Sequence, residues 1–336
     1  MLARRPGAVK RDTASSMPLG DSALPAAAGH WWTVRPLIAH ALDRRPAPAA
    51  TTWSTTLEDK RFGTVTLRGL RDQGRSRTLV LVVHGLGGNA ESHYAIDAAR
   101  AVATAGFDSL RLNLRGAGLD GEDFYHAGLS SDLHAVLASR ELSDYERVLV
   151  LGFSLGGHVA LRYATERVDP RVRAVAAVCS PLDLERSAEA IDRPERWPYR
   201  RHVLSGLKQS YAAIARRRPV PVALASARRI RRIMEWDELV VAPRHAFSSA
   251  RQYYREASVG PLLERLAVPS LLVASRHDPM VLERTLRPAL ERIPDTLEVR
   301  WLERGGHVGF PGDSDLGEAA PPGMEHQVVA WLARQR

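Results

Sequence analysis

The chain of 336 residues contains one cysteine, Cys179. A single cysteine cannot form an internal disulfide, and it cannot build a metal or redox centre that needs several thiolates. This scarcity is typical of a reducing compartment, so we expect a cytoplasmic protein. Cys179 follows an apolar run, residues 175–178, which predicts a buried small side chain rather than a nucleophile.

Long apolar runs are also missing from the sequence. No stretch approaches the ~20 uninterrupted apolar residues that a membrane-spanning helix needs. The basic N-terminus is not followed by the apolar segment of a secretory signal, because Gly20, Asp21 and Ser22 interrupt that region. We therefore expect neither a membrane span nor a secretory signal.

Acidic residues are outnumbered, with 38 Asp and Glu against 47 Lys and Arg, for a formal net charge of +9. Such a surplus indicates either a solvated basic surface or attraction to an anionic surface. We favour the solvated surface, and the arginine-rich stretch 216–232 keeps a peripheral contact with an anionic membrane open as a hypothesis. No recognised nucleic-acid-binding module accompanies the charge, so no nucleic-acid partner is expected.

Composition divides the chain near its N-terminus. Residues 1–28 are rich in Ala, Pro, Gly, Ser and Arg and show no apolar period, which predicts a disordered basic tail. Residues 29–336 are expected to form the folded domain. Its first segment, Trp31 to Ile38, carries two adjacent tryptophans and is expected to dock on the rest of that domain.

Apolar strand-like runs alternate with helical patterns along most of the chain. This alternation predicts a mostly parallel central sheet with helices on both faces. Between about residues 184 and 261 no convincing strand occurs, which predicts a helical cap inserted between the later strands. The expected strands are 63–68, 78–84, 107–114, 147–151, 172–179, 270–275 and 298–302, and the expected helices are 92–104, 130–140, 155–166, 281–293 and 324–334.

The run Gly152-Phe153-Ser154-Leu155-Gly156 lies directly between an apolar strand and a helical segment. This pattern is typical of a nucleophile elbow, in which a sharp turn exposes a serine hydroxyl and the flanking glycines make room for the turn. The helix that follows directs its N-terminal amides towards the same place. The motif predicts acyl transfer through a serine ester at Ser154.

A serine nucleophile needs a histidine base and an acid that orients the histidine. After an elbow, the acid and then the histidine follow later strands, and Asp278 and His307 occupy these positions. Asp183, after the preceding strand, is an alternative acid. His277 is an alternative base, although it adjoins the predicted acid in the sequence.

An oxyanion hole needs two backbone amides aimed at the developing negative charge. We expect one from Leu155 and the other from Leu86, within the glycine-rich segment 84–88 that follows a buried strand. A phosphate-binding role for this segment is weaker, because neither GxxxxGK[ST] nor GxGxxG is present.

Together these motifs resemble the YheT-like branch of the α/β-hydrolase superfamily, which includes the eukaryotic abhydrolase-domain proteins 1 and 3 and the yeast medium-chain ester synthases. The resemblance implies an α/β-hydrolase fold and a triad of Ser154, Asp278 and His307. It gives no role to the Tyr-His-x-Gly pattern at residues 125–128. The matching stretches are HGLGGNAESHY (84–94), NLRGAG (113–118), FYHAGLSSDL (124–133), LGFSLGGHVALRY (151–163), RRIMEWDE (231–238), YYREASVGPLL (253–263), VPSLLVASRHDPMV (268–281) and GGHVGF (305–310).

From the motifs and the resemblance we expect a serine carboxylester hydrolase that acts on medium- or long-chain acyl esters through an acyl-enzyme intermediate. Its substrate would be a small-molecule ester or lipid, and no metal or organic cofactor is required. Two alternatives stay open. One is an acyltransferase that forms esters from an acyl donor and an alcohol, and the other is a non-catalytic binding protein with a hydrolase fold.

Overall fold

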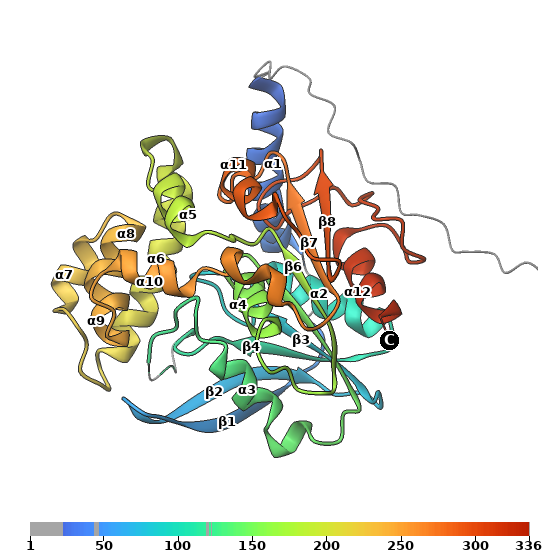
Figure 1. The fold of residues 1–336 in the computed structure, drawn as a ribbon, viewed down its shortest axis with the longest axis horizontal. Coiled ribbons are helices and arrows are strands. Elements are labelled where there is room, and N and C mark those ends of the chain that lie inside the picture. The colour runs from blue at the N-terminus through green and yellow to red at the C-terminus, as the bar shows by residue number, and fades with distance from the viewer. Residues whose placement is uncertain (1–22, 44–46, 119–120, 122, 336) are drawn as a thin grey trace, which may run out of the picture.

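An eight-stranded sheet runs through the centre of the computed structural model, which describes residues 23–43, 47–118, 121 and 123–335. The strand order is β1-β2-β4-β3-β5-β6-β7-β8 (Figure 1). The pairs β1·β2 and β2·β4 are antiparallel and all others are parallel. The strands are β1 (Thr51–Asp59), β2 (Gly63–Asp72), β3 (Thr78–Val83), β4 (Asp108–Asn113), β5 (Arg147–Phe153), β6 (Val172–Val178), β7 (Ser270–Ser275) and β8 (Leu297–Leu302).

Helices cover both faces of this sheet, because the central strands are apolar on both sides. In β3, Leu79 and Leu81 join one core cluster and Val80 and Val82 join the other. The first cluster includes α3 (Ser131–Leu137) and α4 (Leu155–Ala164), and the second includes α2 (His93–Thr104) and α12 (Met324–Arg334). The predicted α/β architecture is therefore confirmed.

The chain between β6 and β7 is helical and forms a cap over the carboxyl ends of the strands (Figure 1). It contains no strand from residue 184 to residue 261, a range that the structure describes completely. Its helices are α5 (Leu184–Ile191), α6 (Trp197–Ile214), α7 (Leu224–Arg229), α8 (Ile233–Trp236), α9 (Ala242–His245) and α10 (Ala250–Ala257), with a π-helical turn at Asp237–Val241 and 3₁₀ turns at Pro194–Arg196 and Gly260–Arg265.

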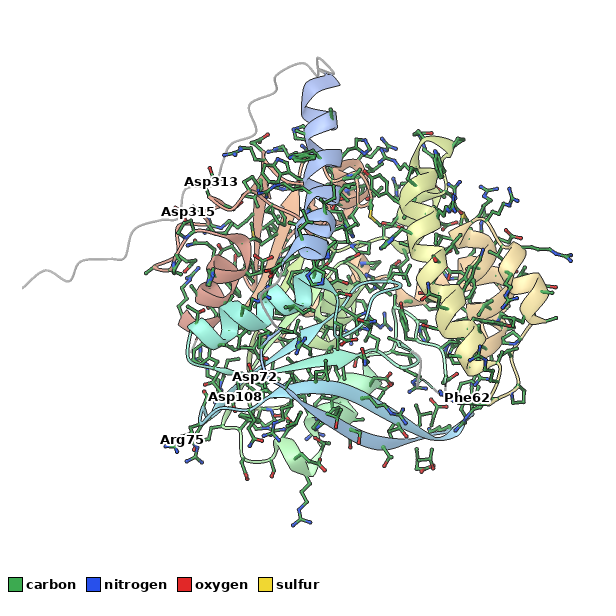
Figure 2. All side chains as sticks on the ribbon, turned by 180° about the vertical axis from the view of Figure 1, so that it is seen from behind. Phe62, Asp72, Arg75, Asp108, Asp313 and Asp315 are labelled. Atoms are coloured by element: carbon green, nitrogen blue, oxygen red, sulfur yellow. The ribbon has the colours of Figure 1, made fainter. Side chains whose placement is uncertain are left out.

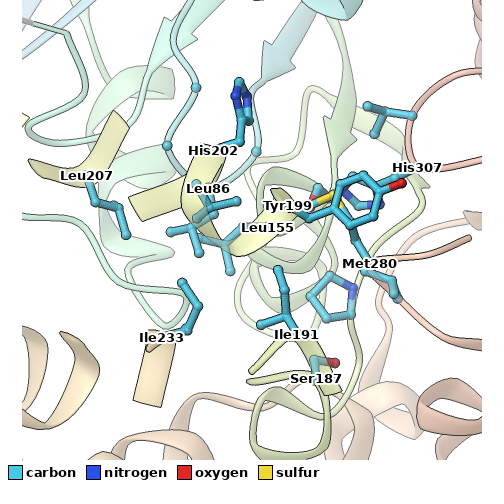
Figure 3. A pocket seen from close by; sticks show the side chains of 18 of the residues that line it. Leu86, Leu155, Ser187, Ile191, Tyr199, His202, Leu207, Ile233, Met280 and His307 are labelled. Atoms are coloured by element: carbon cyan, nitrogen blue, oxygen red, sulfur yellow. The ribbon is translucent and has the colours of Figure 1, made fainter. Parts of the chain in front are cut away.

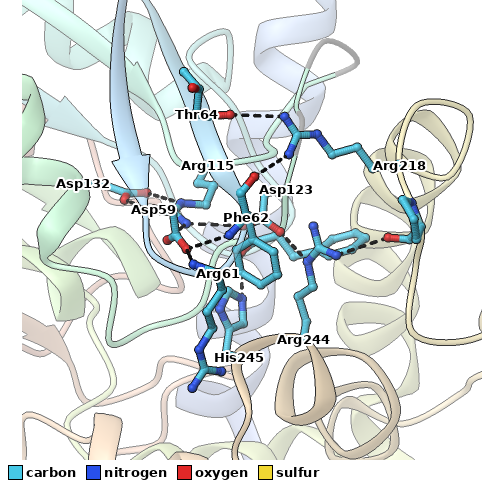
Figure 4. A network of polar contacts seen from close by, with 12 residues as sticks. Asp59, Arg61, Phe62, Thr64, Arg115, Asp123, Asp132, Arg218, Arg244 and His245 are labelled. Atoms are coloured by element: carbon cyan, nitrogen blue, oxygen red, sulfur yellow. Dashed lines mark hydrogen bonds and ion pairs between the residues drawn. The ribbon is translucent and has the colours of Figure 1, made fainter.

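Buried ion pairs join the cap to the β1–β2 hairpin (Figure 4). The Arg115 guanidinium lies 2.6 Å from Asp59, 2.6 Å from Asp132 and 3.3 Å from Asp123. Asp123 also accepts from Arg244 of α9 at 2.6 Å. Arg218, one of the arginines in the basic stretch of the sequence, donates to the Phe62 carbonyl at 2.9 Å. Part of that basic stretch therefore fastens the cap rather than facing solvent.

Two carboxyl groups, Asp72 and Asp108, lie together where β2 ends and β4 begins (Figure 2). Burial, with the Asp108 charge added, raises the pKa of Asp72. Asp108 accepts from the amide of Gly74 at 2.9 Å and from the hydroxyl of Tyr145 at 2.7 Å. This end of the sheet carries the amino ends of β3 and β4, so Asp108 fixes the β2–β3 loop there, away from the carboxyl ends of the parallel strands.

Two expectations about local structure differ from what is observed, and one strand was not predicted. Helix α1 (Ala23–Leu42) includes residues 23–28, so the predicted disorder is wrong there, and residues 1–22 lie outside the described residues. The expected helix 281–293 is only a short α11 (Glu283–Leu286) and a 3₁₀ turn (Arg287–Leu290), because Pro288 has no amide donor for a longer helix. Strand β1 was not anticipated. Among the described residues, no helix has the length and apolar character required to cross a membrane.

Candidate active site

Ser154 occupies the single position between β5 and α4, with φ 51° and ψ −122°. This backbone conformation is costly for a residue with a Cβ atom, by roughly 1–3 kcal/mol. The neighbouring glycines allow it. A Cβ at Gly152 would lie 2.4 Å from the Gly156 carbonyl oxygen, and a Cβ at Gly156 would lie 2.3 Å from that of Val83. The sequence motif therefore folds as a sharp strand–turn–helix with Ser154 at its apex.

The structure brings Ser154, Asp278 and His307 together from the loops after β5, β7 and β8. His307 Nε2 lies 3.0 Å from Ser154 Oγ, and His307 Nδ1 lies 2.9 Å from Asp278 Oδ2. The other carboxylate oxygen of Asp278 accepts from the amides of Met280 at 2.7 Å and Val281 at 2.9 Å. Asp278 is therefore held at both oxygens, and one of them orients the imidazole towards the serine.

Within the described residues, the alternative acid, Asp183, and the alternative base, His277, make no hydrogen bond with the serine or the imidazole through their side chains. Asp183 caps α5, where its carboxylate accepts from the Arg186 amide at 3.0 Å. The geometry thus separates these two residues from the serine and the imidazole.

The loop after β3 approaches the elbow closely, since a Cβ at Gly85 would lie 2.9 Å from Ser154 Cβ. Two tyrosine hydroxyls fix this loop: Tyr94 accepts from the Gly85 amide at 3.0 Å, and Tyr125 accepts from the Gly87 amide at 2.7 Å. The contact gives Tyr125, part of the Tyr-His-x-Gly pattern, a structural role. In the part of the chain that the structure describes, the amides of Leu86 and Leu155 donate no hydrogen bond.

His84 holds the start of the same loop. Its Nε2 accepts from the Leu114 amide at 3.0 Å, and its Nδ1 lies 2.7 Å from the Gly85 carbonyl oxygen. Burial lowers the pKa of His84 to about 4, so the ring is neutral at pH 7, with Nδ1 as donor and Nε2 as acceptor. His84 therefore positions backbone and does not exchange protons near neutral pH.

Helix α1 contacts the loop that carries His307. The sequence analysis did not predict this contact. Thr33 Oγ1 accepts from the His307 amide at 2.8 Å and donates to the Gly29 carbonyl at 2.8 Å. A Cβ at Gly306 would lie 2.3 Å from the Gly29 oxygen, and one at Gly309 would lie 2.0 Å from the Trp32 oxygen. The glycines beside His307 therefore admit α1 at close range. The run of glycines was the only sequence signal for this contact.

Cys179 lies next to Asp278 and His307 and is buried, as expected. Burial, reinforced by the Asp278 charge, raises the pKa of its thiol well above the usual range, so it stays protonated. Ligand atoms of Cys179, Asp278 and His307 lie within 4.8 Å of one another. This set does not suit a metal ion, because the thiol is protonated and the carboxylate and imidazole already bind each other.

A cavity of about 560 Å³ opens beside Ser154, between the sheet and the cap (Figure 3). This volume lies within the range of about 300–1,000 Å³ that is usual for small-molecule sites. Its walls are mainly apolar and come from α1, the loop after β3, α4, the cap and the loop after β7. They include Leu86, Leu155, Ile191, Leu207, Ile233 and Met280.

Asp237 is a polar exception in the cavity wall. The Tyr254 hydroxyl donates to its carboxyl group at 2.7 Å. Burial raises the pKa of Asp237 to about 7, because the surrounding protein disfavours the charged form more than the tyrosine stabilises it.

We predict that the Asp237→Asn variant gains stability relative to the wild-type protein as pH rises. The folded state binds the Asp237 proton more tightly than the unfolded state, so wild-type stability falls as pH rises from about 4 to about 7. The asparagine side chain does not titrate, so the variant does not lose this stability as pH rises. The difference in Tm between variant and wild type should grow by about 2–4 °C between pH 4 and pH 8 in thermal unfolding. A difference that stays constant with pH contradicts this prediction.

A family model described as alpha/beta hydrolase fold matches residues 78–228. The candidate esterase YheT of Escherichia coli is 32% identical over 272 residues, which cover 77% of this chain and 78% of that protein. A monoacylglycerol lipase of Saccharomyces cerevisiae is 23% identical over 248 residues, covering 70% of this chain and 55% of that protein.

The fold also matches solved structures. The alpha/beta hydrolase GrgF from Penicillium aligns with a TM-score of 0.51 at 18% sequence identity, covering 77% of this chain and 91% of that one. This similarity supports the fold alone, because the sequence identity is low.

Proposed function

Because the chain belongs to the α/β-hydrolase family, in the branch of YheT, we propose that Ser154, Asp278 and His307 form its catalytic triad. The chain is a carboxylic ester hydrolase. The proposal is based mainly on two hydrogen-bond contacts that link the three side chains. His307 Nε2 lies 3.0 Å from Ser154 Oγ, and His307 Nδ1 lies 2.9 Å from Asp278 Oδ2.

In the first half of the reaction, Ser154 Oγ attacks the ester carbonyl carbon while His307 Nε2 takes the hydroxyl proton. The protonated His307 then gives this proton to the leaving alcohol, and an acyl-serine ester remains. Asp278 fixes the tautomer in which Nδ1 carries the proton and Nε2 is free to accept. In the second half, His307 removes a proton from water, which attacks the acyl carbon. The bond to Ser154 Oγ then breaks, His307 returns its proton to this oxygen, and the carboxylic acid leaves.

The amides of Leu86 and Leu155 are our candidates for the oxyanion hole. Both are free donors in the described structure, and both belong to segments that contact the elbow. Tyr94 and Tyr125 occupy the amides on either side of Leu86, so the loop presents one donor and its orientation is fixed. Such preorganised donors commonly contribute about 10²–10³-fold each to kcat.

The apolar cavity supports an acyl or alkyl chain as the main substrate feature. A volume of about 560 Å³ fits a medium-chain acyl group together with a small alcohol. The test is turnover of p-nitrophenyl esters of increasing acyl length, followed by product analysis with added ethanol. Hydrolysis of acyl esters with free acid as the main product supports the proposal. Ethyl ester as the main product favours the acyltransferase, and no turnover of any ester contradicts both.

Thr33→Val is expected to lower kcat about tenfold while KM stays within about twofold of wild type, because a displaced base weakens proton transfer more than binding. The valine keeps the shape but cannot accept from the His307 amide. Thr33→Ser retains the hydroxyl and should restore most of the activity. Steady-state kinetics on a water-soluble ester check this. Equal loss in both variants, or none in Thr33→Val, contradicts the positioning role of Thr33.

A further inference from the structure

Helix α1 carries an exposed apolar face opposite the face that contacts the His307 loop. Eight large apolar side chains are exposed in the described part of the protein, and five of them lie on this helix: Trp31, Val34, Leu37, Ile38 and Leu42. The spacing of 31, 34, 38 and 42 places four of them in one stripe along the helix. Figures 1 and 2 show that the N-terminal part of α1 extends beyond the neighbouring elements.

This face lies at the entrance of the cavity. Val34 and Leu37 line the cavity from α1, and Pro198 and His202 line it from the first turns of α6. The two helices touch, since the rings of His30 and Tyr199 stack with centroids 5.6 Å apart. Trp197, at the start of α6, is a sixth exposed apolar residue, with 54% of its surface accessible. The apolar patch is therefore continuous with the apolar cavity.

The charges on these two helices have one sign. The sequences of α1 and α6 contain no Asp or Glu. Arg35 of α1 and Arg201 of α6 are exposed, and the whole chain carries a net charge of +9. A helix with exposed tryptophan and leucine and with basic neighbours suits the interface of an anionic bilayer. Like charges on both copies would oppose the pairing of two such faces.

We propose that α1 and the first turn of α6 form a docking surface for an anionic lipid bilayer, on which the mouth of the cavity opens. An ester dissolved in the bilayer then reaches Ser154 without crossing water. The same helix holds the His307 amide through Thr33, so the docked element is also the one that braces the imidazole. Docking is independent of the proposed chemistry, and only its use for substrate entry rests on the proposed function.

The test is sedimentation of the full-length protein with vesicles of phosphatidylcholine alone and of phosphatidylcholine mixed with phosphatidylglycerol. The variant combines Trp31→Ser, Ile38→Ser and Leu42→Ser, none of which lines the cavity. The matched control combines Leu239→Ser and Ile293→Ser, the two exposed large apolar residues of the described structure that lie outside this surface. Wild type and control should bind the mixed vesicles, and the triple variant should bind at least about tenfold more weakly.

Turnover of a water-soluble short ester separates docking from chemistry, because the triple variant should keep the wild-type rate. The Ser154→Ala protein should bind vesicles like wild type, so a failure of the proposed function leaves this test intact. Wild type that does not bind mixed vesicles overturns the inference, as does a triple variant that binds equally well. A wild-type dimer in light scattering that the triple variant loses also overturns it, because a second copy would then cover the face.

Discussion

Ser154→Ala is expected to lower kcat for ester hydrolysis by at least about 10⁴-fold, because it removes the only atom that can form the acyl-enzyme. The 3.0 Å contact from His307 Nε2 ends at this hydroxyl oxygen. The remaining rate would come from binding and from the free amides of Leu86 and Leu155. Steady-state turnover of a p-nitrophenyl ester measures the loss.

The fold should survive this change. Alanine retains the Cβ atom, so the strained backbone at φ 51° is neither relieved nor worsened, and Tm should stay close to wild type. Ser143→Ala, at an exposed serine in a surface turn, is a matched control for loss of a hydroxyl and should keep full activity. A Ser154→Ala protein that is folded and retains more than about one tenth of wild-type kcat rejects the proposed nucleophile.

Asp278→Asn should lower kcat by about 10³–10⁴-fold, the second largest effect that we expect. The carboxylate accepts from two amides through one oxygen and from His307 Nδ1 through the other. In asparagine the carbonyl oxygen would keep the amides, and the side-chain NH₂ would face His307. The imidazole would then carry its proton on Nε2, where it can no longer accept the proton of Ser154.

The control for this variant is Asp183→Asn, at the alternative acid. Asp183 caps α5 and lies outside the contacts of His307, so its replacement should lower stability slightly and leave kcat within about twofold. The acid proposed here is rejected if Asp183→Asn loses activity while Asp278→Asn keeps it. Kinetics of both variants on one ester decide between the two carboxyl groups.

The sequence predicted the central sheet and located the three residues that meet, because each follows a strand and stands in a motif. Ser154 is marked by its glycines, and Asp278 and His307 by their position after apolar runs. Leu86 could be selected as an oxyanion donor only from the glycine-rich loop. Its free amide becomes evident once Tyr94 and Tyr125 are seen to occupy the neighbouring amides. Tyr94 ends the same sequence stretch as the loop, but Tyr125 lies 38 residues beyond Gly87, and no local pattern connects it to the loop.

The sequence predicted that residues 31–38 dock on the domain, but it did not predict the helix α1, for a physical reason. Its docked face consists of small residues such as Gly29 and Thr33, whereas its large apolar residues, including Ile38, are exposed. A search for an apolar face that packs on the core therefore assigns the helix the wrong side, or no helix at all. Strand β1 lies at the sheet edge and alternates with polar threonines, so its apolar signal is weak.

The most direct test of the account is to identify the residue that an acyl-enzyme mimic modifies. The protein is treated with a fluorophosphonate, which phosphonylates activated serines, and the labelled peptide is located by mass spectrometry. We predict one adduct on Ser154 in wild type, slower labelling in Asp278→Asn and none in Ser154→Ala. An unlabelled wild-type protein, or an adduct on another serine, would contradict the claim that Ser154 is the nucleophile.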